Sequence, residues 1–341
     1  MKVLMISGDA TILNSNVPAG KRTEEYRNVL GELDILLCYG SVFSFISGVF
    51  KGCNLMRRKD FDVITAQSPE HWALAWLLSS FFHVPWHMQV HTDILSPFFK
   101  KESFKNKLRV LFFKFLLPRA DGVRVVSERI KKSILAHNRL LINELAVLPI
   151  YVDSGRIKDF IPKMDLRKKY PDYNFIILMA SRLTCEKNIG LAFEAMAEFK
   201  KNNSRALLLI VGDGPEKENL KFKVSEFKLN NNVIFESWTD DLISYYKTAD
   251  VFLLTSDYEG YGMSLVEAAF AGCKIISSDV GIASEILEPE NIFRVNDKND
   301  LVSKLENAIQ GKIKSPKPIS TQTKEDYLRL YRNSLEKCTK K

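Results

Sequence analysis

The chain has 341 residues, enough for two domains of ordinary size, each with its own hydrophobic core. Hydrophobic residues make up 46% and charged residues 26%, which is typical of a globular protein and argues against a disordered or fibrous chain. The net charge of +8 suits an anionic ligand or a membrane surface. No nucleic-acid-binding motif accompanies the lysines, so nucleic acid is not an expected partner.

Five cysteines are scattered along the chain without a C-x-x-C pair, which predicts reduced thiols in a cytosolic protein. The first apolar run is too short for a signal peptide and is typical of a buried strand. No uninterrupted apolar run reaches the ~18 residues that a membrane span needs. We therefore expect a cytoplasmic protein that is neither exported nor anchored by a transmembrane helix.

Short apolar runs alternate with helix-length amphipathic segments, the pattern of parallel α/β domains. In the first half, strands are predicted at residues 3–7, 33–38, 62–66, 87–91, 122–126 and 146–148. In the second half, they are predicted at 175–180, 207–211, 233–235, 251–254, 274–278 and 292–295. Two doubly wound sheets are expected, and such sheets bind ligands beyond the carboxyl ends of their strands, so facing sheets would form one cleft between domains.

Residues 98–119 hold seven basic residues and a single acidic one, Glu102. Five apolar side chains recur there at helical spacing: Phe104, Leu108, Leu111, Phe112 and Phe115. We expect this stripe to be a helix face packed on its own domain. The alternative is a peripheral contact with a membrane, in which lysines meet anionic headgroups and rings lie at the interface.

The segment from Thr255 to Ala269 follows a predicted strand and begins a helix. Gly260 and Gly262 let the backbone turn tightly and approach a ligand closely. The amides at a helix N-terminus favour an anion such as phosphate. Glu259 lies in the loop and Glu267 about one turn into the helix, so the two carboxylates can contact different parts of one ligand. Taken singly, each would be an ordinary solvated residue.

This stretch resembles the E-x7-E signature of retaining nucleotide-sugar glycosyltransferases with the GT-B fold, and the resemblance extends over most of the chain. It implies two Rossmann-like domains facing across a cleft: an acceptor-binding domain of residues 1–150 and a donor-binding domain of residues 151–321. A last helix, about 324–337, would cross back onto the first domain. The implied enzyme is a retaining hexosyltransferase of cell-surface polysaccharide or glycoconjugate synthesis.

On the donor side, Arg182 and Lys187 follow a predicted strand and are similar to the family's two diphosphate-binding cations. Fixed cations stabilise the charge that develops on a departing diphosphate. A lysine near a helix start is otherwise disfavoured unless an anion joins it. By the same resemblance, Glu267 binds the ribose hydroxyls and Glu259 lies near the donor sugar. The remaining donor-binding residues implied are Gly212, Gly214, Trp238, Gly260, Tyr261, Gly262 and Met263.

On the acceptor side, His91 ends a predicted strand and resembles the family's histidine beside the transferred sugar. We expect it to position the sugar by hydrogen bonding and not to act as a general base. Many relatives have a double glycine after the first strand, which this chain lacks. Gly20 would provide the close approach instead, and Lys21 and Arg22 would meet an acceptor phosphate.

The resemblance requires no metal and no other cofactor, and Asp240-Asp241 is not a D-x-D motif. Two alternatives stay open: an epimerase or phosphorylase of the same fold, and a non-catalytic nucleotide-sugar-binding partner of another transferase. The base, the sugar, the acceptor, the linkage and the oligomeric state depend on side chains that the motifs do not identify.

Overall fold

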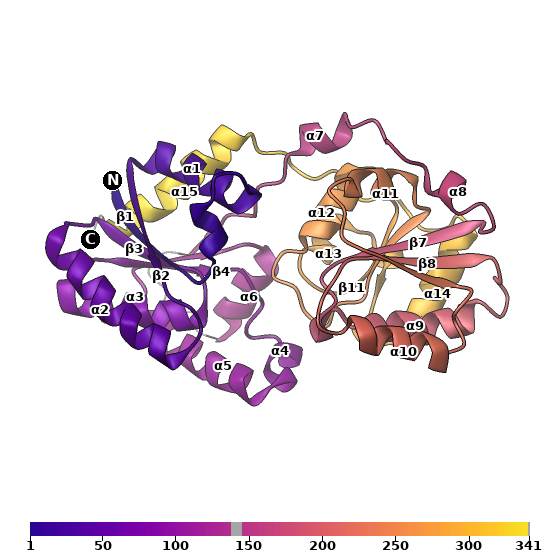
Figure 1. Ribbon diagram of the computed structural model, residues 1–341, viewed down its shortest axis with the longest axis horizontal. Coiled ribbons are helices and arrows are strands. Elements are labelled where there is room, and N and C mark those ends of the chain that lie inside the picture. Colours follow the sequence, from indigo (N-terminus) through magenta and orange to yellow (C-terminus); the bar gives the residue numbers. More distant parts are fainter. Residues whose placement is uncertain (138–144, 340–341) are drawn as a thin grey trace. The chain divides into compact units, whose positions relative to one another are not determined.

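The computed structural model describes residues 1–137 and 145–339 (Figure 1). The chain divides into two compact units. Unit 1 comprises Met1–Tyr151 and Gln322–Lys341, and unit 2 comprises Val152–Thr321. Each unit contains one six-stranded parallel sheet with helices on both faces. The predicted α/β class with two parallel sheets is therefore confirmed.

The sheet of unit 1 has the order β2-β1-β3-β4-β5-β6. Its strands are β2 (Glu32–Leu37), β1 (Lys2–Ser7), β3 (Val63–Ala66), β4 (Trp86–Val90), β5 (Gly122–Val125) and β6 (Leu145–Val147). Most of the central strands β1, β3, β4 and β5 is buried, because helices cover both faces and leave no solvated side. After β1 the next strand, β2, is added on one side of the sheet, and from β3 onward the strands are added on the other side. The carboxyl ends of β1 and β3 are therefore the switch point of the sheet.

In unit 1, helices α2 (Val42–Arg58), α3 (Pro69–Phe82) and α5 (Phe104–Leu116) cover one face of the sheet. Helices α1 (Pro18–Leu30) and α15 (Lys324–Thr339) cover the other (Figure 1). The unit also contains η1 (Ala10–Leu13), α4 (Pro97–Glu102), η2 (Leu117–Arg119) and α6 (Glu128–His137). The buried face of α15 shares a core with α1 and β1, so the end of the chain completes the fold of the first unit.

The stretch predicted as one helix at 98–119 is broken at Ser103, whose Oγ accepts a hydrogen bond from the amide of Asn106 (3.1 Å) and so caps α5. The apolar stripe of α5 that was expected to pack on its own domain is exposed, and this expectation is wrong. The helix instead packs through its other side, with Asn106, Val110, Phe113 and Leu116 buried. Periodicity identified an apolar face, but α5 has a second one, and only one of them can meet the sheet.

The sheet of unit 2 has the order β12-β11-β10-β7-β8-β9. Its strands are β12 (Ile292–Phe293), β11 (Ile275–Ser278), β10 (Val251–Leu254), β7 (Phe175–Ala180), β8 (Ala206–Val211) and β9 (Val233–Glu236). Among the described residues, every predicted strand of both sheets is present, and its ends differ from the prediction by two residues at most. The switch point of this sheet lies between β7 and β10.

Helices α9 (Ile189–Phe199), α10 (Lys217–Glu226) and α14 (Lys298–Ile309) share the main core of unit 2. Helices α11 (Leu242–Thr248) and α12 (Met263–Phe270) pack together on the other face (Figure 1). The shorter helices are α7 (Ser154–Lys158), α8 (Leu166–Lys169), η3 (Cys185–Lys187), α13 (Ala283–Ile286) and η4 (Pro289–Asn291). Within the described part of the chain, none of the helices has the length and apolar character needed to cross a bilayer.

Candidate donor and acceptor site

Arg182, Lys187, Glu259 and the turn of residues 260–262 lie at the switch point of the unit 2 sheet. Two loops meet there: residues 181–188 after β7, and residues 255–262 after β10. Three hydrogen bonds join them: Thr255 Oγ1 to the carbonyl of Lys187 (2.8 Å), the Asp257 amide to the carbonyl of Glu186 (2.9 Å), and Asn188 Nδ2 to Asp257 Oδ1 (2.9 Å). The two loops are therefore held in one fixed arrangement.

Lys187 and Glu259 form an ion pair within this arrangement. The Nζ of Lys187 lies 2.5 Å from Oε1 of Glu259, and each side chain is only 15% exposed. Ser256 Oγ donates to the same carboxylate oxygen (2.9 Å). The anion that joins Lys187 in this structure is thus a carboxylate of the chain itself.

Arg182, the other predicted cation, is not part of this pair. Its side chain is 80% exposed, and its guanidinium lies 3.9 Å from Oε1 of Glu186. Glu186 also accepts a hydrogen bond from Thr184 Oγ1 (2.6 Å). The structure therefore places one cation of the predicted pair in a fixed contact and leaves the other accessible to an anion in solution.

Gly212 and Gly214 follow β8 and pack against the loop after β7. A Cβ at Gly212 would lie 2.0 Å from the carbonyl oxygen of Ser181, and one at Gly214 would lie 2.4 Å from that of Leu183. The amide of Leu183 donates to the carbonyl of Asp213 (2.8 Å). In this structure the two glycines let a second loop approach the backbone next to Arg182.

The turn between β10 and α12 contains Gly260, Tyr261 and Gly262, and α12 begins at Met263. Gly262 has φ +91°, a conformation that disfavours other residues, and it precedes the first helical residue, Met263, without a side-chain cap. The amides of this helix start therefore have no side-chain partner at the cap position. Burial raises the pKa of Tyr261 to about 12, so its phenol stays neutral.

Glu267 lies in α12, where Tyr246 OH donates to its Oε2 (3.4 Å). Burial raises the pKa of this carboxyl group above its ordinary value. Trp238, the last predicted donor-side residue, follows β9 and is 58% exposed. Glu236, at the end of β9, is occupied by hydrogen bonds from Lys169, Tyr170 and Tyr245.

In unit 1, His91 follows β4 directly and is joined to a buried polar network. Arg124 Nη1 donates to Oε1 of Gln89 (3.1 Å), which identifies that atom as the carbonyl oxygen because arginine has no acceptor. The Nε2 of His91 lies 3.4 Å from the same oxygen. The proton on the imidazole must therefore be on Nε2, so Nδ1 is the acceptor. Burial and the nearby Arg124 and Arg22 charges lower the pKa of His91 to about 3.

The sequence analysis did not identify Gln89 and Arg124, although both are polar residues within apolar strands, which is a usable signal. Arg124 is 1% exposed and has no carboxylate among its hydrogen-bond partners in the described chain. It donates to the carbonyl of Leu148 (3.2 Å) and to Tyr327 OH (3.1 Å) of α15. A full positive charge is therefore held in the core, on the network that orients His91.

The predicted acceptor residues begin α1. The space beside Gly20 is filled by the chain itself, since a Cβ there would lie 1.9 Å from the carbonyl oxygen of Asn14. Lys21 and Arg22 are exposed, and Arg22 is near enough to affect the titration of His91. Gly20 thus serves a contact within unit 1.

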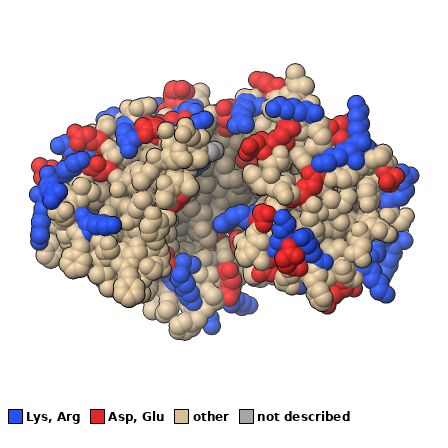
Figure 2. Space-filling view, viewed as in Figure 1, with Lys and Arg blue, Asp and Glu red and all other residues tan. Residues whose placement is uncertain are grey.

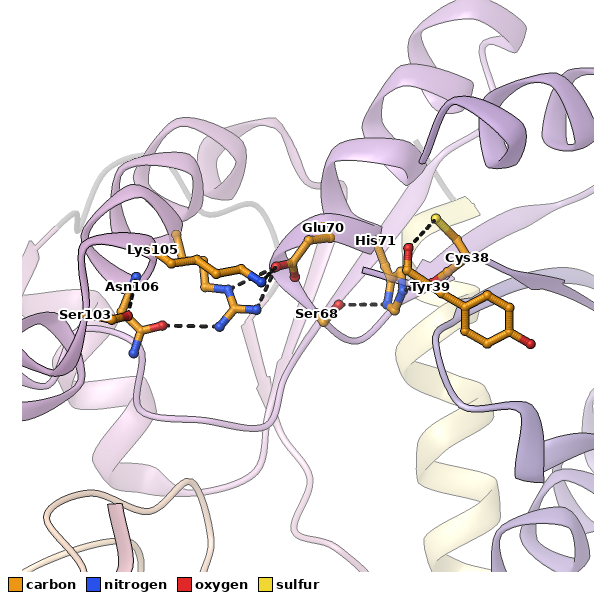
Figure 3. A network of polar contacts seen from close by, with 9 residues as sticks. Cys38, Tyr39, Ser68, Glu70, His71, Ser103, Lys105 and Asn106 are labelled. Carbon is orange, nitrogen blue, oxygen red and sulfur yellow. Dashed lines mark hydrogen bonds and ion pairs between the residues drawn. The ribbon is translucent and has the colours of Figure 1, made fainter. Parts of the chain in front are cut away.

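A cavity of about 210 Å³ lies beside His91 in unit 1 and was not predicted. Its lining includes Glu70 and Arg109, whose Nη2 donates to Oε1 of Glu70 (2.7 Å) (Figure 3). Ser68 also lines the cavity, and its Oγ lies 2.7 Å from Nδ1 of His71. Nε2 of His71 donates to the carbonyl of Cys38 (2.7 Å), so polar contacts connect the carboxyl ends of β2 and β3 (Figure 3).

Comparisons with known proteins agree with this architecture. The model of the glycosyl transferase 4-like domain matches residues 26–150, and that of the glycosyl transferases group 1 matches residues 163–326. Sucrose-phosphate synthase from Thermosynechococcus elongatus superposes with a TM-score of 0.76 at 18% identity, over 98% of this chain and 94% of that one. The chain thus has the GT-B fold of glycosyltransferases, as predicted.

Within that class, residues 163–326 form a domain of the glycosyl transferases group 1. An uncharacterised glycosyltransferase of Methanocaldococcus jannaschii is 26% identical over 204 residues, 59% of this chain but only 50% of that relative, so the match spans half the relative's length. The UDP-Gal:alpha-D-GlcNAc-diphosphoundecaprenol alpha-1,3-galactosyltransferase of Escherichia coli is 24% identical over 272 residues, 76% of this chain and 69% of the relative.

Proposed function

We propose that this protein transfers a sugar from a nucleoside-diphosphate sugar to a glycan, lipid-linked or small-molecule acceptor, with retention of the anomeric configuration. The observation that carries the proposal is the arrangement of Arg182, Lys187, Glu259 and Glu267 around the switch point of the unit 2 sheet, where doubly wound sheets bind nucleotides. The family membership and the E. coli relative, whose name gives a UDP-sugar donor, support the same class of reaction.

In this proposal, Arg182 and Lys187 bind the donor diphosphate. The exposed Arg182 guanidinium is free to meet an incoming anion, and Lys187 is already oriented by its ion pair. As the bond between the sugar and the diphosphate breaks, negative charge grows on the leaving group. Lys187, held in place by its ion pair, and Arg182, once it contacts the diphosphate, stabilise that charge.

Glu259 holds the donor sugar and does not attack it. Its Oε1 is shared between Lys187 and Ser256, and a carboxylate engaged in this way is a weak nucleophile. The acceptor hydroxyl instead approaches the face from which the diphosphate departs, and its proton passes to a diphosphate oxygen. This route leaves the configuration unchanged and needs no second carboxylate. Glu267, one turn into α12, accepts hydrogen bonds from the ribose.

His91 positions the transferred sugar. Its ring is neutral at physiological pH, and its Nε2 proton is directed to Gln89, so Nδ1 is left to accept a hydrogen bond from a sugar hydroxyl. Lys21, Arg22 and the cavity lined by Arg109 offer cationic groups to a phosphate-bearing acceptor in unit 1. The E. coli relative is named for a diphosphoundecaprenol-linked acceptor, which is consistent with an acceptor of this kind.

The proposal places the protein in the cytoplasm, peripherally on the inner face of the membrane, in polysaccharide or glycoconjugate synthesis. It includes no metal and no cofactor, because Arg182 and Lys187 provide the charge that a cation would otherwise supply. Asp241 precedes α11 and accepts a hydrogen bond from Ser244 Oγ (2.9 Å), a structural use of this acidic residue. Turnover that survives EDTA is the expected result.

The first experiment is thermal-shift binding with uridine and guanosine diphosphates and their sugars. Stabilisation by one nucleotide series would identify the base, and turnover with acceptor candidates would follow. Arg182→Ala should weaken diphosphate binding at least tenfold, whereas Arg294→Ala, at an equally exposed arginine (83%) paired with Asp297, should not. Normal binding and turnover in Arg182→Ala and Glu259→Ala would contradict the proposal. Product formation without an acceptor would indicate an epimerase.

A further inference from the structure

Helix α5 has an apolar stripe on each of two opposite sides. One side, with Val110 and Phe113, is buried against unit 1. The opposite side carries five exposed apolar residues: Phe104 (73%), Leu108 (42%), Leu111 (65%), Phe112 (53%) and Phe115 (43%). An ordinary surface helix places charged and polar residues there. In α5, the lysines instead flank the exposed stripe at neighbouring helical positions: Lys105, Lys107 and Lys114.

Helix α2 repeats this arrangement. Its buried positions are Gly48, Gly52 and Met56, and its exposed side presents Val42 (74%), Phe43 (87%), Ile46 (48%) and Phe50 (73%). The two glycines bring α2 close to α3, since a Cβ at Gly48 would lie 3.0 Å from Leu74 and one at Gly52 would lie 2.7 Å from Leu78. The exposed side of α2 therefore points away from the sheet.

Helix α3 lies between the other two and continues the surface. It contacts α2 and α5, and Trp76 packs edge-to-face on Phe115, with ring centroids 5.4 Å apart. Its exposed apolar residues are Leu77 (40%) and Phe81 (72%). Three adjacent helices thus present one surface, which we call the apolar face: Val42, Phe43, Ile46, Phe50, Leu77, Phe81, Phe104, Leu108, Leu111, Phe112 and Phe115.

The charges of these helices have one sign. Helices α2 and α5 contain no acidic residue, and the acidic residue of α3, Glu70, is paired with Arg109. The basic residues are Lys51, Arg57, Arg58, Lys105, Lys107, Arg109 and Lys114. Figure 2 shows the surface over α2, α3 and α5 as a broad uncharged area with lysines and arginines at its borders. A monomer rarely leaves an apolar surface of this extent uncovered.

We infer that the apolar face docks on an anionic bilayer surface. Phenylalanine and leucine side chains enter the interfacial region, and the flanking lysines contact the negatively charged headgroups. Charge complementarity selects this occupant over a second copy of the chain, because a symmetric dimer through this face would set basic residues against basic residues. The surface belongs to three helices, of which only α5 was suspected from the sequence.

The inference that the apolar face binds a membrane depends only on the surface of unit 1. Its consequence for the reaction, that membrane binding brings unit 1 to a lipid-linked acceptor, rests on the proposed function. Vesicle binding requires no turnover, so the two can fail separately. A protein that binds vesicles and transfers no sugar would refute only the proposed function. A protein that transfers sugar to a soluble acceptor and ignores vesicles would refute only the docking.

The test is co-sedimentation of the full chain with phosphatidylcholine vesicles, with and without phosphatidylglycerol, at low salt. Binding should require phosphatidylglycerol and weaken with salt. The triple variant Phe43→Ser, Phe50→Ser, Phe112→Ser should bind about tenfold less or weaker still. The triple variant Lys105→Gln, Lys107→Gln, Lys114→Gln should lose vesicle binding to the same extent. All substituted side chains are exposed, so the melting temperature should stay near that of the unmodified protein, and it is measured for each variant.

Matched controls come from unit 2. Phe222 on α10 is 65% exposed, and Lys201, Lys221 and Lys314 are 65%, 48% and 60% exposed. Phe222→Ser and the triple Lys→Gln variant at these positions should bind vesicles like the unmodified chain. Equal losses in the controls, or no binding of the unmodified protein, would overturn the inference. Self-association in sedimentation velocity that the Phe→Ser triple variant abolishes, without vesicle binding, would assign the face to a second copy.

Discussion

Lys187 and Glu259 are 72 positions apart in the chain, and their side chains meet at 2.5 Å between Nζ and Oε1, with each side chain 15% exposed. Each was singled out from a different motif, one after β7 and one after β10. The pair shows that the two motifs lie together in unit 2. In the proposed function, a diphosphate that approaches Lys187 would meet a lysine that is already oriented.

This pair predicts the effects of two substitutions. Lys187→Met should reduce donor binding or turnover at least tenfold, and it should destabilise unit 2 by about 1–2 kcal/mol because Glu259 loses its charged partner. Adding Glu259→Gln should recover most of the stability and none of the activity. Urea denaturation and steady-state kinetics on the double-mutant cycle measure both. Unchanged turnover in Lys187→Met would assign the pair a purely structural role.

Glu267 predicts a variant that gains stability and loses function. Burial raises its pKa in the folded protein, so the folded state holds its proton more tightly than the unfolded state. Stability therefore falls as the pH rises from the ordinary value of 4.5 through the raised pKa. Glu267→Gln should raise the melting temperature at pH 7, with the difference shrinking toward pH 4.

The same substitution should weaken nucleotide affinity about tenfold, because ribose hydroxyls bind an ionised acceptor more strongly than an amide. Thermal melts across this pH range and calorimetric titration with nucleotide test the two effects separately. A melting temperature that is lower at pH 7 would mean that the Tyr246 hydrogen bond to the carboxylate outweighs its burial. Unchanged affinity would remove Glu267 from the donor site.

His91 should show no titration between pH 8 and pH 5, because its pKa is lowered to about 3. The groups that bear on its ring are Arg124 on β5, Arg22 on α1 and the neighbouring His87. Long-range ¹H–¹⁵N spectra should show a neutral ring protonated on Nε2.

Gln89→Glu tests whether burial and the neighbouring positive charges lower the pKa of His91. A carboxylate beside the ring favours the charged imidazole, so the pKa of His91 should rise and its titration should move into the observable range. Gln89→Met removes the acceptor for Nε2 and should mix the two tautomers, and it should lower stability because the buried Arg124 also loses an acceptor. A single Nδ1-protonated form in the unmodified protein would refute the assignment of roles in this network.

The hydrogen bonds of Arg124 indicate that the last helix, α15, is essential for the stability of unit 1. Its guanidinium is buried and depends on Tyr327 OH for one of its acceptors (3.1 Å), and Tyr327 OH also lies 2.9 Å from Tyr26 OH. Tyr327→Phe should cost about 1–3 kcal/mol, because it leaves a donor of a buried cation unpaired. Tyr173→Phe removes a hydroxyl that donates to Asn231 at the surface (2.9 Å) and should cost much less. Denaturant unfolding compares them, and equal effects would contradict the argument.

Much of the architecture was predictable because parallel sheets leave a clear pattern. Strands covered on both faces are continuous apolar runs, and polar loops with glycine separate them from helices. The strand limits therefore differ little from the prediction, and the donor motifs are located at strand ends. Gln89 and Arg124 were missed for a different reason. A polar residue inside an apolar strand indicates a buried polar contact, but the sequence does not show which residues provide the partners.

The stripe at Phe104 shows a different limit. Periodicity reveals that side chains share one side of a helix, but it does not reveal whether that side meets a core. In α5, the stripe of Asn106, Val110, Phe113 and Leu116 packs against the rest of unit 1, and the more aromatic stripe is exposed to solvent. The buried stripe was harder to recognise in the sequence because it includes a polar residue, Asn106. The Nδ2 of Asn106 donates a hydrogen bond to the carbonyl of Phe99 (3.1 Å).

The sequence by itself determined the alternation of strands and helices, the loops that carry Arg182, Lys187, Glu259 and Glu267, and the basic character of α5. These features depend on neighbours along the chain, through backbone propensity and side-chain period. Only the tertiary structure decided that Lys187 pairs with Glu259, that α15 supplies Tyr327 to Arg124, and that the apolar face is exposed. Such contacts join residues far apart in sequence, and they follow from the order of strands in each sheet, which local interactions do not specify.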